Sequence, residues 1–411
     1  MKIERTGLPG VVVHKNSAAL SPFLNKLLRI GFQGRAKSQR RDQKSIENWT
    51  SKTVQSSSMR VTVRSCAKIN FGLCIGVLRS DGFHELRTVY QTIALHDVIS
   101  VSVGRGAGIE IRCEDTRVPK DSTNTCFRIA ERAVQALKAR GRVVIEIEKR
   151  LPVQGGLGGA SGNGVAVLLA LERALGKQLP GPERLRIAAE VGSDLPLFLI
   201  GGTVLGLGRG EEVYPLPDLP STPCVVATPE IAVSTPKAFA DWDRLGGAGA
   251  RVRELTEHGS ARTGSEGPVG LHKSKLTAPP HSDRMLEFSR ELSAWLSAGL
   301  VLGLRRSGVS ARGGGRAETL QLDLVRTGIE NDFEKVVFPQ YPELRKVKGV
   351  LERAGASYAS LAGSGSAVYG LFDSRERAAR AAKKLNLGGT PAVVTSTLPR
   401  RQYWKRCQIS D

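Results

Sequence analysis

The chain has 411 residues, of which 40% are hydrophobic and 5% aromatic, and an excess of lysine and arginine gives a net charge of +21. This length allows about two or three domains. The scarcity of aromatic residues argues against a site that stacks carbohydrate or single-stranded nucleic acid. Six cysteines without a C-x-x-C pair exclude a disulfide scaffold, and no spacing predicts a zinc site. No apolar run reaches the roughly 18 residues of a membrane span.

The positive charge is concentrated at the two ends of the chain. Residues 1–58 carry a net charge of +8, and residues 374–411 carry +7. A basic excess favours a polyanionic partner such as nucleic acid, a phosphate-rich ligand or an acidic membrane. A basic nucleic-acid-binding protein is therefore one hypothesis. The C-terminal charges are spread over a predicted helix and tail, which favours an ordinary solvated surface.

Residues 1–58 are rich in serine and arginine and poor in acidic residues. This composition is typical of a targeting peptide, such as a plastid transit peptide, and equally of a disordered extension. A third interpretation is a start codon assigned too early, with Met59 as the true start. The scattered cysteines and the absence of a secretory signal predict a cytoplasmic protein, or a plastid protein if residues 1–58 are a transit peptide.

From residue 59 the pattern becomes that of a folded domain, which we expect to extend to residue 223. Hydrophobic periodicity predicts strands over 61–64, 69–78, 85–95, 98–103, 109–113 and 143–148. The strands over 98–103 and 109–113 are expected to form a hairpin. Helices are predicted over 124–139, 165–175 and 183–191, and a further hairpin over 204–207 and 212–216. A glycine-rich loop occupies residues 154–164.

A second domain is expected over residues 224–411. Strands are predicted over 224–227, 231–233, 359–361, 367–372 and 392–398, and helices over 341–354 and 375–385. Residues 241–320 contain tracts of Ser, Gly, Thr and Pro around one candidate helix at 285–302, which predicts a flexible insertion. The mixture of strands and helices predicts an α+β protein.

The strongest local motif is the glycine-rich segment from Leu151 to Gly164, set between a predicted strand and a predicted helix. Its glycines allow the backbone to approach a ligand closely. The unpaired N–H groups of such a loop and of the following helix start form a cradle for an anion such as phosphate. The segment lacks the Gly-Lys-Ser/Thr ending of a Walker A loop. A flexible glycine turn without a ligand is the alternative interpretation.

Two charged residues carry the candidate chemistry. Asp194, in Gly192-Ser-Asp-Leu-Pro196, could orient or deprotonate a hydroxyl nucleophile, although an aspartate there could equally be a helix cap. Lys68 lies in an apolar strand, where an unpaired charge is costly, and Asp194 is its candidate partner. A lysine that protects an edge strand is the alternative.

Taken in order, these segments resemble the GHMP kinase superfamily and, within it, the 4-diphosphocytidyl-2-C-methyl-D-erythritol kinase family. The motifs that carry the resemblance are Ala67-Lys-Ile-Asn70, Arg79-Ser-Asp-Gly-Phe-His-Glu-Leu86, Leu151-Pro152 with Gly156-Leu-Gly-Gly159, Gly192-Ser-Asp-Leu-Pro196, Thr235-Pro236, Glu330-Asn-Asp-Phe333 and Leu361-Ala-Gly-Ser-Gly365. The resemblance covers about residues 59–240 and 329–398. It implies an N-terminal domain like ribosomal protein S5, a C-terminal ferredoxin-like α/β domain, and an active site in the cleft between them.

The resemblance also implies an activity and a set of site residues. It implies transfer of the ATP γ-phosphate, with Mg²⁺, to the 2-hydroxyl of the cytidylyl polyol. Asp194 and Lys68 match the catalytic pair. The residues that match the ATP site are Pro152, Gly155, Gly156, Leu157, Gly158, Gly159, Ala160, Ser161, Asn124 and Lys149. Those that match the substrate site are Asn70, Phe83, His84, Phe239, Gly363 and Gly365. No protein side chain is assigned as a metal ligand.

Details of the match leave the reaction class unchanged. In the implied site, Phe83 and Phe239 sandwich the cytosine and His84 contacts its edge. Gly162 replaces the second serine of the usual loop, and Gly162 and Gly164 are each expected to weaken the helix by about 1 kcal/mol relative to alanine. A related kinase for another alcohol, of the mevalonate or homoserine type, is the second hypothesis. We expect a monomer or homodimer that binds neither nucleic acid nor a membrane.

Overall fold

The computed structural model describes residues 59–257, 285, 288–290, 292 and 330–408. The expectations for residues 1–58 and for most of the 241–320 segment lie outside these residues. Within the described part of the chain, no helix is long and apolar enough to cross a membrane.

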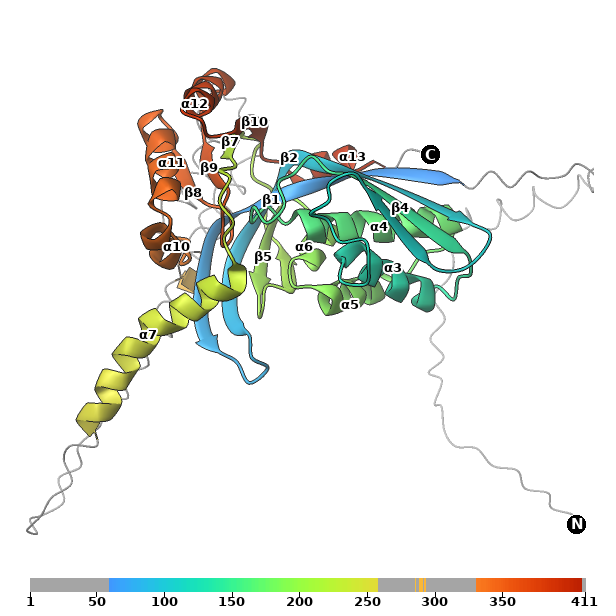
Figure 1. Ribbon diagram of the computed structural model, residues 1–411, viewed down its shortest axis with the longest axis horizontal. Helices are drawn as coiled ribbons and strands as arrows, with labels where there is room; N and C mark the ends of the chain where they lie inside the picture. The colour runs from blue at the N-terminus through green and yellow to red at the C-terminus, as the bar shows by residue number, and fades with distance from the viewer. Residues whose placement is uncertain (1–58, 258–284, 286–287, 291, 293–329, 409–411) are drawn as a thin grey trace, which may run out of the picture. The chain divides into compact units, whose positions relative to one another are not determined.

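A long antiparallel hairpin of two strands forms the main part of the first sheet (Figure 1). Its strands are β1 (Arg60–Leu78) and β2 (His84–Gly104), and β1 is interrupted by register shifts near Ala67 and Asn70. The sheet is completed by β3 (Ile109–Cys113), β4 (Arg142–Glu148), β5 (Thr203–Leu207) and β6 (Glu212–Pro215). The strand order is β3-β4-β2-β5-β6, with β1 also paired to β2.

The predicted hairpin over 98–103 and 109–113 is wrong. β4 lies between the two segments, antiparallel to the end of β2 and parallel to β3. The short connection between β2 and β3 suggested direct pairing, but β4, with Val143 and Ile145 buried, forms ladders with both. The predicted strands over 61–64 and 69–78 are one strand, as are those over 85–95 and 98–103.

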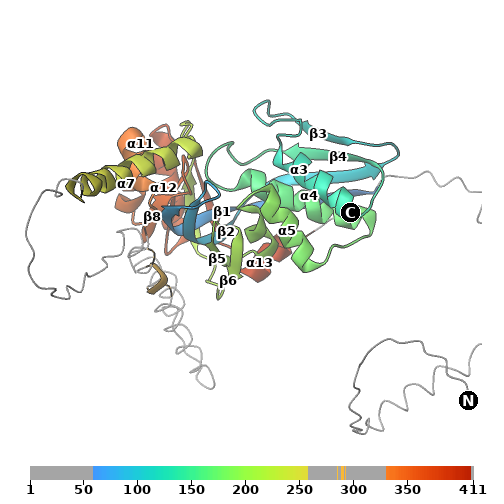
Figure 2. The ribbon, with the colours of Figure 1, turned by 90° about the horizontal axis from the view of Figure 1, so that it is seen from below.

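Helices pack on this sheet, and their close approach explains two unusual glycines. They are α3 (Thr125–Ala136), α4 (Gly159–Leu175), α5 (Gly181–Val191) and α6 (Leu195–Ile200). Figure 1 labels all four helices, and Figure 2 shows α3, α4 and α5 from another side. A Cβ on Gly162 would lie 2.9 Å from Ser65 Oγ, and a Cβ on Gly164 would lie 3.1 Å from the Thr125 side chain. Both glycines therefore let α4 pack against β1 and α3, which offsets their low helix propensity. α4 begins at Gly159, earlier than the predicted residue 165.

The second sheet has the connectivity of a ferredoxin-like fold. Its strands are β7 (Pro223–Ala227), β8 (Tyr358–Leu361), β9 (Val368–Leu371) and β10 (Ala392–Ser396), in the order β10-β7-β9-β8 and antiparallel throughout. Helices α11 (Pro342–Arg353) and α12 (Arg375–Leu387) pack on it (Figure 1). The remaining helices are α7 (Thr235–Glu257), α10 (Glu334–Gln340) and α13 (Arg400–Arg406).

Several local predictions in this half need correction. Residues 231–233 form no strand, and residues 241–257, assigned to the flexible insertion, continue helix α7. The described residues of the 285–302 segment are helical, and Met285 and Phe288 are buried against the β1–β2 face. Helices α6, α10 and α13 were not predicted. The domain boundary at residues 223 and 224 stays a prediction.

The β1–β2 hairpin also joins the second sheet to the first. Leu73 N donates to Glu330 O, and Asp332 N donates to Leu73 O. The buried Asp332 carboxylate accepts from Ile75 N at 2.9 Å. These bonds attach the Glu330–Phe333 motif to β1 and bring the later glycine turn toward Lys68.

Candidate active site

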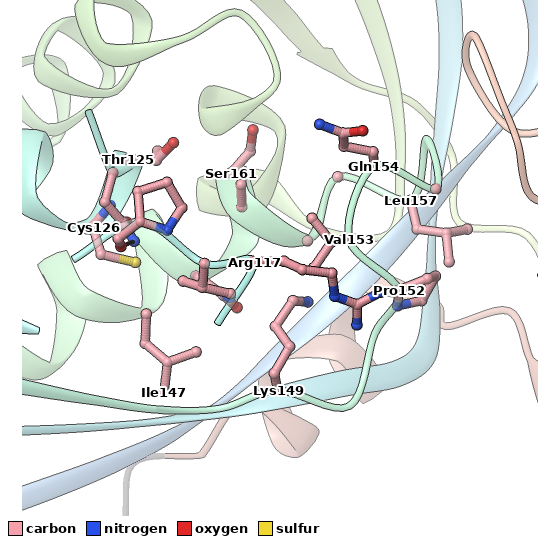
Figure 3. Close-up of a pocket in the computed structure, with 18 of the residues that line it drawn as sticks. Arg117, Thr125, Cys126, Ile147, Lys149, Pro152, Val153, Gln154, Leu157 and Ser161 are labelled. Atoms are coloured by element: carbon pink, nitrogen blue, oxygen red, sulfur yellow. Dashed lines mark hydrogen bonds between the residues drawn. The ribbon is translucent and has the colours of Figure 1, made fainter. Parts of the chain in front are cut away.

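A cavity of about 380 Å³ lies over the loop between β4 and α4 (Figure 3). Every residue predicted for the ATP site lines it: Pro152, Gly155, Gly156, Leu157, Gly158, Gly159, Ala160, Ser161, Asn124 and Lys149. Ser161 lies in the first turn of α4, and Lys149 follows β4 (Figure 3). Backbone N–H groups at a helix start together with a lysine suit a phosphate-bearing ligand.

The conformation of the loop depends on Gly156. Its φ is +73°, and a Cβ there would overlap the backbone carbonyl of Ala362. The loop is held on its other side by Lys68 N, which donates to Leu157 O at 2.9 Å, and by Ala367 N, which donates to Gly155 O at 3.2 Å. The loop therefore packs between strand β1 and the second glycine turn.

A buried carboxylate anchors the start of the same loop. Asp97 is fully buried and accepts from Lys149 Nζ at 2.7 Å, from Asn163 Nδ2 at 2.9 Å, and from the backbone N–H groups of Arg150 and Leu151 at 2.7 Å. Four donors compensate for the desolvation of this charge. Asp97 thus orients the Lys149 side chain, which lines the cavity.

Asn124 lines the cavity but its side chain has a structural role. It is the N-cap of α3, where its Oδ1 accepts from Cys126 N at 2.8 Å. Its Nδ2 donates to Pro119 O at 2.6 Å. Burial raises the pKa of the neighbouring Cys126 to about 12, so this thiol stays protonated.

A second cavity, of about 680 Å³, lies beside the first. It is lined by the predicted catalytic pair, Lys68 and Asp194, and by most of the predicted substrate residues: Asn70, Phe83, His84, Phe239 and Gly363. Gly156 and Gly158 line both cavities. A ligand in the first cavity can therefore reach the carboxylate side of the second across these two glycines.

Lys68 and Asp194 form an ion pair at the meeting point of the cavities. Lys68 Nζ lies 3.3 Å from Asp194 Oδ2 and donates to Asn70 Oδ1 at 2.9 Å. Asp194 occupies the N-cap position of α6, but its side chain makes no capping hydrogen bond. The helix-cap alternative is thus not what the structure shows, because the carboxylate points to the lysine. The ion pair also explains how a buried lysine is tolerated in β1.

Asn70 supports the lysine from the same strand. Its Nδ2 donates to Thr88 Oγ1 at 2.8 Å, and Thr88 in turn donates to Gly72 O at 2.6 Å. The amide is therefore fixed by β1 and β2, with its oxygen on the amine of Lys68. Thr88 has no sequence signal of its own, because its contact depends on strand register.

The tip of the β1–β2 hairpin carries the predicted cytosine contacts. Arg79 pairs with Asp81 at 3.1 Å and with Glu85 at 3.1 Å, which organises the turn. Phe83 is half exposed, and the Arg209 guanidinium lies 4.9 Å from its ring centroid. His84 is buried and stacks on Phe239, with ring centroids 5.2 Å apart and planes 4° apart.

This arrangement differs from the expected aromatic sandwich. In the structure the partner of the Phe239 ring is His84, and Phe83 faces Arg209. The His84 Nε2 also lies 3.1 Å from Asp243 Oδ1 in α7. A sandwich of Phe83 and Phe239 around a base stays a prediction, and it needs Phe83 to rearrange or the base to enter beside His84.

The later glycine turn closes one side of the second cavity. Asn331 Nδ2 donates to Leu361 O at 2.9 Å and to Gly363 O at 2.7 Å, which ties the turn to the Glu330–Phe333 motif. A Cβ on Gly363 would lie 3.3 Å from Lys68 Nζ. Gly365, also predicted as a substrate contact, does not line the cavity, and its N–H instead donates to Ala362 O inside the turn.

The residues available for a metal ion are few. Among the described residues, no group of three or more His, Cys, Asp or Glu side chains could hold one. Magnesium bound to nucleotide phosphates keeps several waters and needs only one or two protein ligands. The hydroxyl of Ser161 in the first cavity is an oxygen donor of the required kind.

Sequence reasoning missed Tyr90, Asp97, Arg117, Arg209 and Asn331. Tyr90 donates through its hydroxyl to Asp194 Oδ1 at 3.0 Å, over a separation of 104 residues. Arg117 lines the first cavity and Arg209 the second. Their positions follow from sheet register and loop packing, which a single sequence does not show; only Asn331, within the Glu330–Phe333 motif, carried a local signal.

Comparison with known proteins shows which family the chain resembles. A model described as the N-terminal domain of GHMP kinases matches residues 124–202, and one for their C-terminal region matches residues 317–389. A 4-diphosphocytidyl-2-C-methyl-D-erythritol kinase from Solibacter usitatus is 35% identical over 85% of this chain and 94% of its own length. The kinase of the same name from Acaryochloris marina is 33% identical over 79% of this chain and 91% of its length.

Solved structures show the same similarity. A crystal structure of 4-(cytidine 5'-diphospho)-2C-methyl-D-erythritol kinase aligns with a TM-score of 0.55 and 26% identity over 82% of this chain and 98% of that one. A homoserine kinase from Cytophaga hutchinsonii aligns with a TM-score of 0.56 at 20% identity, covering 84% of this chain and 97% of that one, which shows the fold alone. The predicted two-domain α+β fold of GHMP kinases is confirmed.

Proposed function

This chain belongs to the 4-diphosphocytidyl-2-C-methyl-D-erythritol kinase family, and we propose that it transfers the γ-phosphate of ATP to the 2-hydroxyl of that cytidylyl polyol. The products are the 2-phosphate and ADP, and the reaction serves the non-mevalonate route to isoprenoid precursors. The observation that carries the proposal is the pair of cavities that share Gly156 and Gly158, with Asp194 and Lys68 at their junction.

The first cavity is the proposed ATP site. Phosphoryl transfer depends mostly on positioning and on neutralising charge spread over phosphate oxygens. The N–H groups from Gly156 to Ser161 and the Lys149 amine supply donors and positive charge for the phosphates. Mg²⁺, which we propose as the cofactor, would neutralise phosphate charge when bound, with the Ser161 hydroxyl as a candidate oxygen ligand.

In the second cavity, Asp194 is the proposed acceptor of the alcohol proton. A free alcohol is a weak nucleophile, so a carboxylate that orients it and takes its proton as the new bond forms assists the reaction. Lys68 pairs with this carboxylate at 3.3 Å and holds it in place. Because an ionised aspartate is a weak base, its main contribution is orientation, with proton transfer late in the step.

Recognition of the cytidine end is assigned to the hairpin tip and α7. Phe83, His84 and Phe239 supply aromatic faces, and a base stacks on such faces. Asn70 and Gly363 lie at the Lys68 end, where the polyol and its diphosphate would be held. Gly365 shapes the same turn from behind. These roles fit a substrate with a base at one end and an alcohol at the other.

The two other hypotheses are less well supported. A mevalonate or homoserine acceptor leaves the aromatic groups at the hairpin tip without a partner. A role in nucleic-acid binding rests on the basic termini, and residues 1–58 lie outside the described part of the chain. The cytoplasm is the proposed compartment, because scattered cysteines suit a reducing environment. Whether the protein is a monomer or a homodimer stays a prediction.

The proposal is tested by measuring ADP release from the purified full chain with ATP, Mg²⁺ and a panel of alcohols. We expect turnover with 4-diphosphocytidyl-2-C-methyl-D-erythritol and a kcat/KM at least 10²-fold lower with mevalonate and homoserine, because a site built for a base and diphosphate loses those contacts. Comparable or greater activity on mevalonate or homoserine would overturn the substrate assignment. Phosphate at a position other than the 2-hydroxyl of the product would overturn the regiochemistry.

A further inference from the structure

Both oxygens of the Asp194 carboxylate are held, by residues from two different strands. Lys68 Nζ of β1 lies 3.3 Å from Oδ2, and the Tyr90 hydroxyl of β2 donates to Oδ1 at 3.0 Å. The Tyr90 side chain is buried, and its ring also lies under the Lys68 amine, 5.6 Å from Nζ to the ring centroid. The lysine, the carboxylate and the phenol therefore form one contiguous cluster.

Two glycines of the β5–β6 hairpin leave space for the Tyr90 side chain. A Cβ on Gly206 would overlap the edge of the Tyr90 ring, and a Cβ on Gly210 would overlap its hydroxyl oxygen. Gly210 has a φ of +101°, which side chains rarely adopt. Since the hairpin leaves room for the ring and for the hydroxyl at two separate points, Tyr90 has a fitted cradle.

The Tyr90 phenol is a donor and not a base. Burial, reinforced by the negative charge of Asp194, raises the pKa of the Tyr90 hydroxyl well above its usual value. The charged groups that act on it are Asp194, Glu211 from the β5–β6 hairpin, and Lys68 above the ring. The hydroxyl therefore stays protonated and donates a hydrogen bond to the carboxylate oxygen.

Asp194 has a competing position available to it. At the N-cap of a helix, an aspartate ordinarily turns back to accept from the N–H of the second or third helical residue. In α6 the second residue is Pro196, which has no N–H, so Leu197 is the remaining donor of that kind. The carboxylate makes no capping bond here and instead contacts Lys68 and Tyr90.

We propose that Tyr90 is a positioning residue for phosphate transfer: its hydrogen bond holds the Asp194 carboxylate away from the α6 cap and toward the acceptor hydroxyl. This inference rests on the proposed function of Asp194. Lys68 fixes one oxygen, and a single contact leaves the carboxylate free to rotate about it. The phenol supplies the second contact, so the remaining lone pairs of the carboxylate face the second cavity in one orientation.

The test is Tyr90→Phe in the full chain, which removes the hydroxyl and keeps the ring in its cradle. We expect kcat to fall about tenfold while KM for ATP and for the alcohol each change less than threefold, because the hydroxyl acts on the carboxylate and not on binding. Tyr214→Phe, at an exposed tyrosine outside both cavities, is the matched control and leaves kcat unchanged.

Two outcomes would overturn the inference. One is a kcat within twofold of the unsubstituted protein. The other is a fall in kcat accompanied by a rise of more than threefold in both KM values and by a lowered melting temperature, which assigns Tyr90 a structural role alone. Failure of the proposed function is a separate result, because it appears in the unsubstituted protein as turnover of a different alcohol. The Tyr90→Phe comparison is then made with that alcohol.

Discussion

The two cavities are adjacent, but backbone shapes one of them and side chains shape the other. The first cavity, which is the proposed nucleotide cavity, is shaped by backbone: four glycines line it, and Gly156 fits only because it has no side chain. The second cavity, which is the proposed substrate cavity, is shaped by side chains from distant segments of the chain, including Lys68, Asp194 and Phe239. The first should therefore be damaged by adding atoms, and the second by removing them.

The largest effect is expected from adding one carbon to the nucleotide cavity. Gly156→Ala places a Cβ against the Ala362 carbonyl and strains a φ of +73°, so the loop must move. A displacement of about 1 Å can lower the rate about 10²-fold, and we expect kcat/KM to fall by at least that factor.

The matched control for this change is Gly176→Ala. Gly176 also has a positive φ, of +61°, but a Cβ there meets nothing within 4 Å. It isolates the backbone strain, about 1–2 kcal/mol of unfolding free energy, from the clash. If both variants lose activity equally, the packing of Gly156 against the second glycine turn is not what shapes the cavity.

The next largest effect is expected from Asp97, a buried side chain that anchors the start of the nucleotide loop. Asp97→Asn leaves the Lys149 ammonium without its buried partner, and removing one member of such a pair costs about 3–5 kcal/mol. Urea unfolding should show this loss of stability, and steady-state kinetics should show a raised KM for ATP. Glu148→Gln, at an exposed partner of Arg150, should change stability by less than about 1 kcal/mol. Equal stability of the two variants would contradict the anchoring role.

Removing a ring from the substrate cavity should separate the two cavities kinetically. Phe239→Ala is expected to raise KM for the cytidylyl substrate roughly tenfold, since stacking on a base contributes about 1–3 kcal/mol. KM for ATP should change less than twofold, because Phe239 lines only the second cavity. Tyr214→Ala, at an exposed ring outside both cavities, is the control. A parallel rise in both KM values would refute a stacking role.

The smallest effect is on stability at alkaline pH, and both cavities contribute to it. Burial raises the pKa of Cys126 in the nucleotide cavity to about 12, and that of Tyr90 in the substrate cavity well above 10.0. The unfolded chain loses these protons above about pH 9 and pH 10, while the folded chain retains them. The folded state thus binds more protons there, and the free energy of unfolding falls as pH rises.

Urea unfolding between about pH 8 and pH 11 measures this slope, and Cys126→Ser should flatten its first part. Serine does not titrate in this range. Above pH 9 the difference in the number of bound protons between the folded and unfolded chains is therefore smaller by one in this variant. A slope that is the same with and without Cys126 would contradict the assignment.

The contrast between the cavities also explains what the sequence could predict. The glycine loop is a contiguous run, so Gly155 to Ser161 could be placed in the nucleotide cavity from local pattern and resemblance. Tyr90 and Asp97 could not be found in this way, because a buried tyrosine and a strand aspartate have no local signature. Their roles come from hydrogen bonds to residues 52 to 104 positions away.

The same distinction between local patterns and long-range contacts accounts for the errors in the predicted fold. Helices such as α3 and α11 were predicted almost to their ends, because their apolar period and caps are local. The pairing of β3 with β4 instead of β2 is a long-range choice that short-loop reasoning misjudged. The His84–Phe239 stack depends on α7 approaching the hairpin tip, which no pattern in the sequence specifies.

The most direct test of the account is the turnover number of Asp194→Asn, measured with the cytidylyl polyol alongside the affinity for ATP. The substitution keeps the size of the side chain and removes its charge and its capacity to accept a proton. We predict that kcat falls roughly 10²- to 10⁴-fold while ATP binds within twofold of the unsubstituted protein, because Asp194 lies outside the nucleotide cavity. Turnover close to that of the unsubstituted protein would contradict the account.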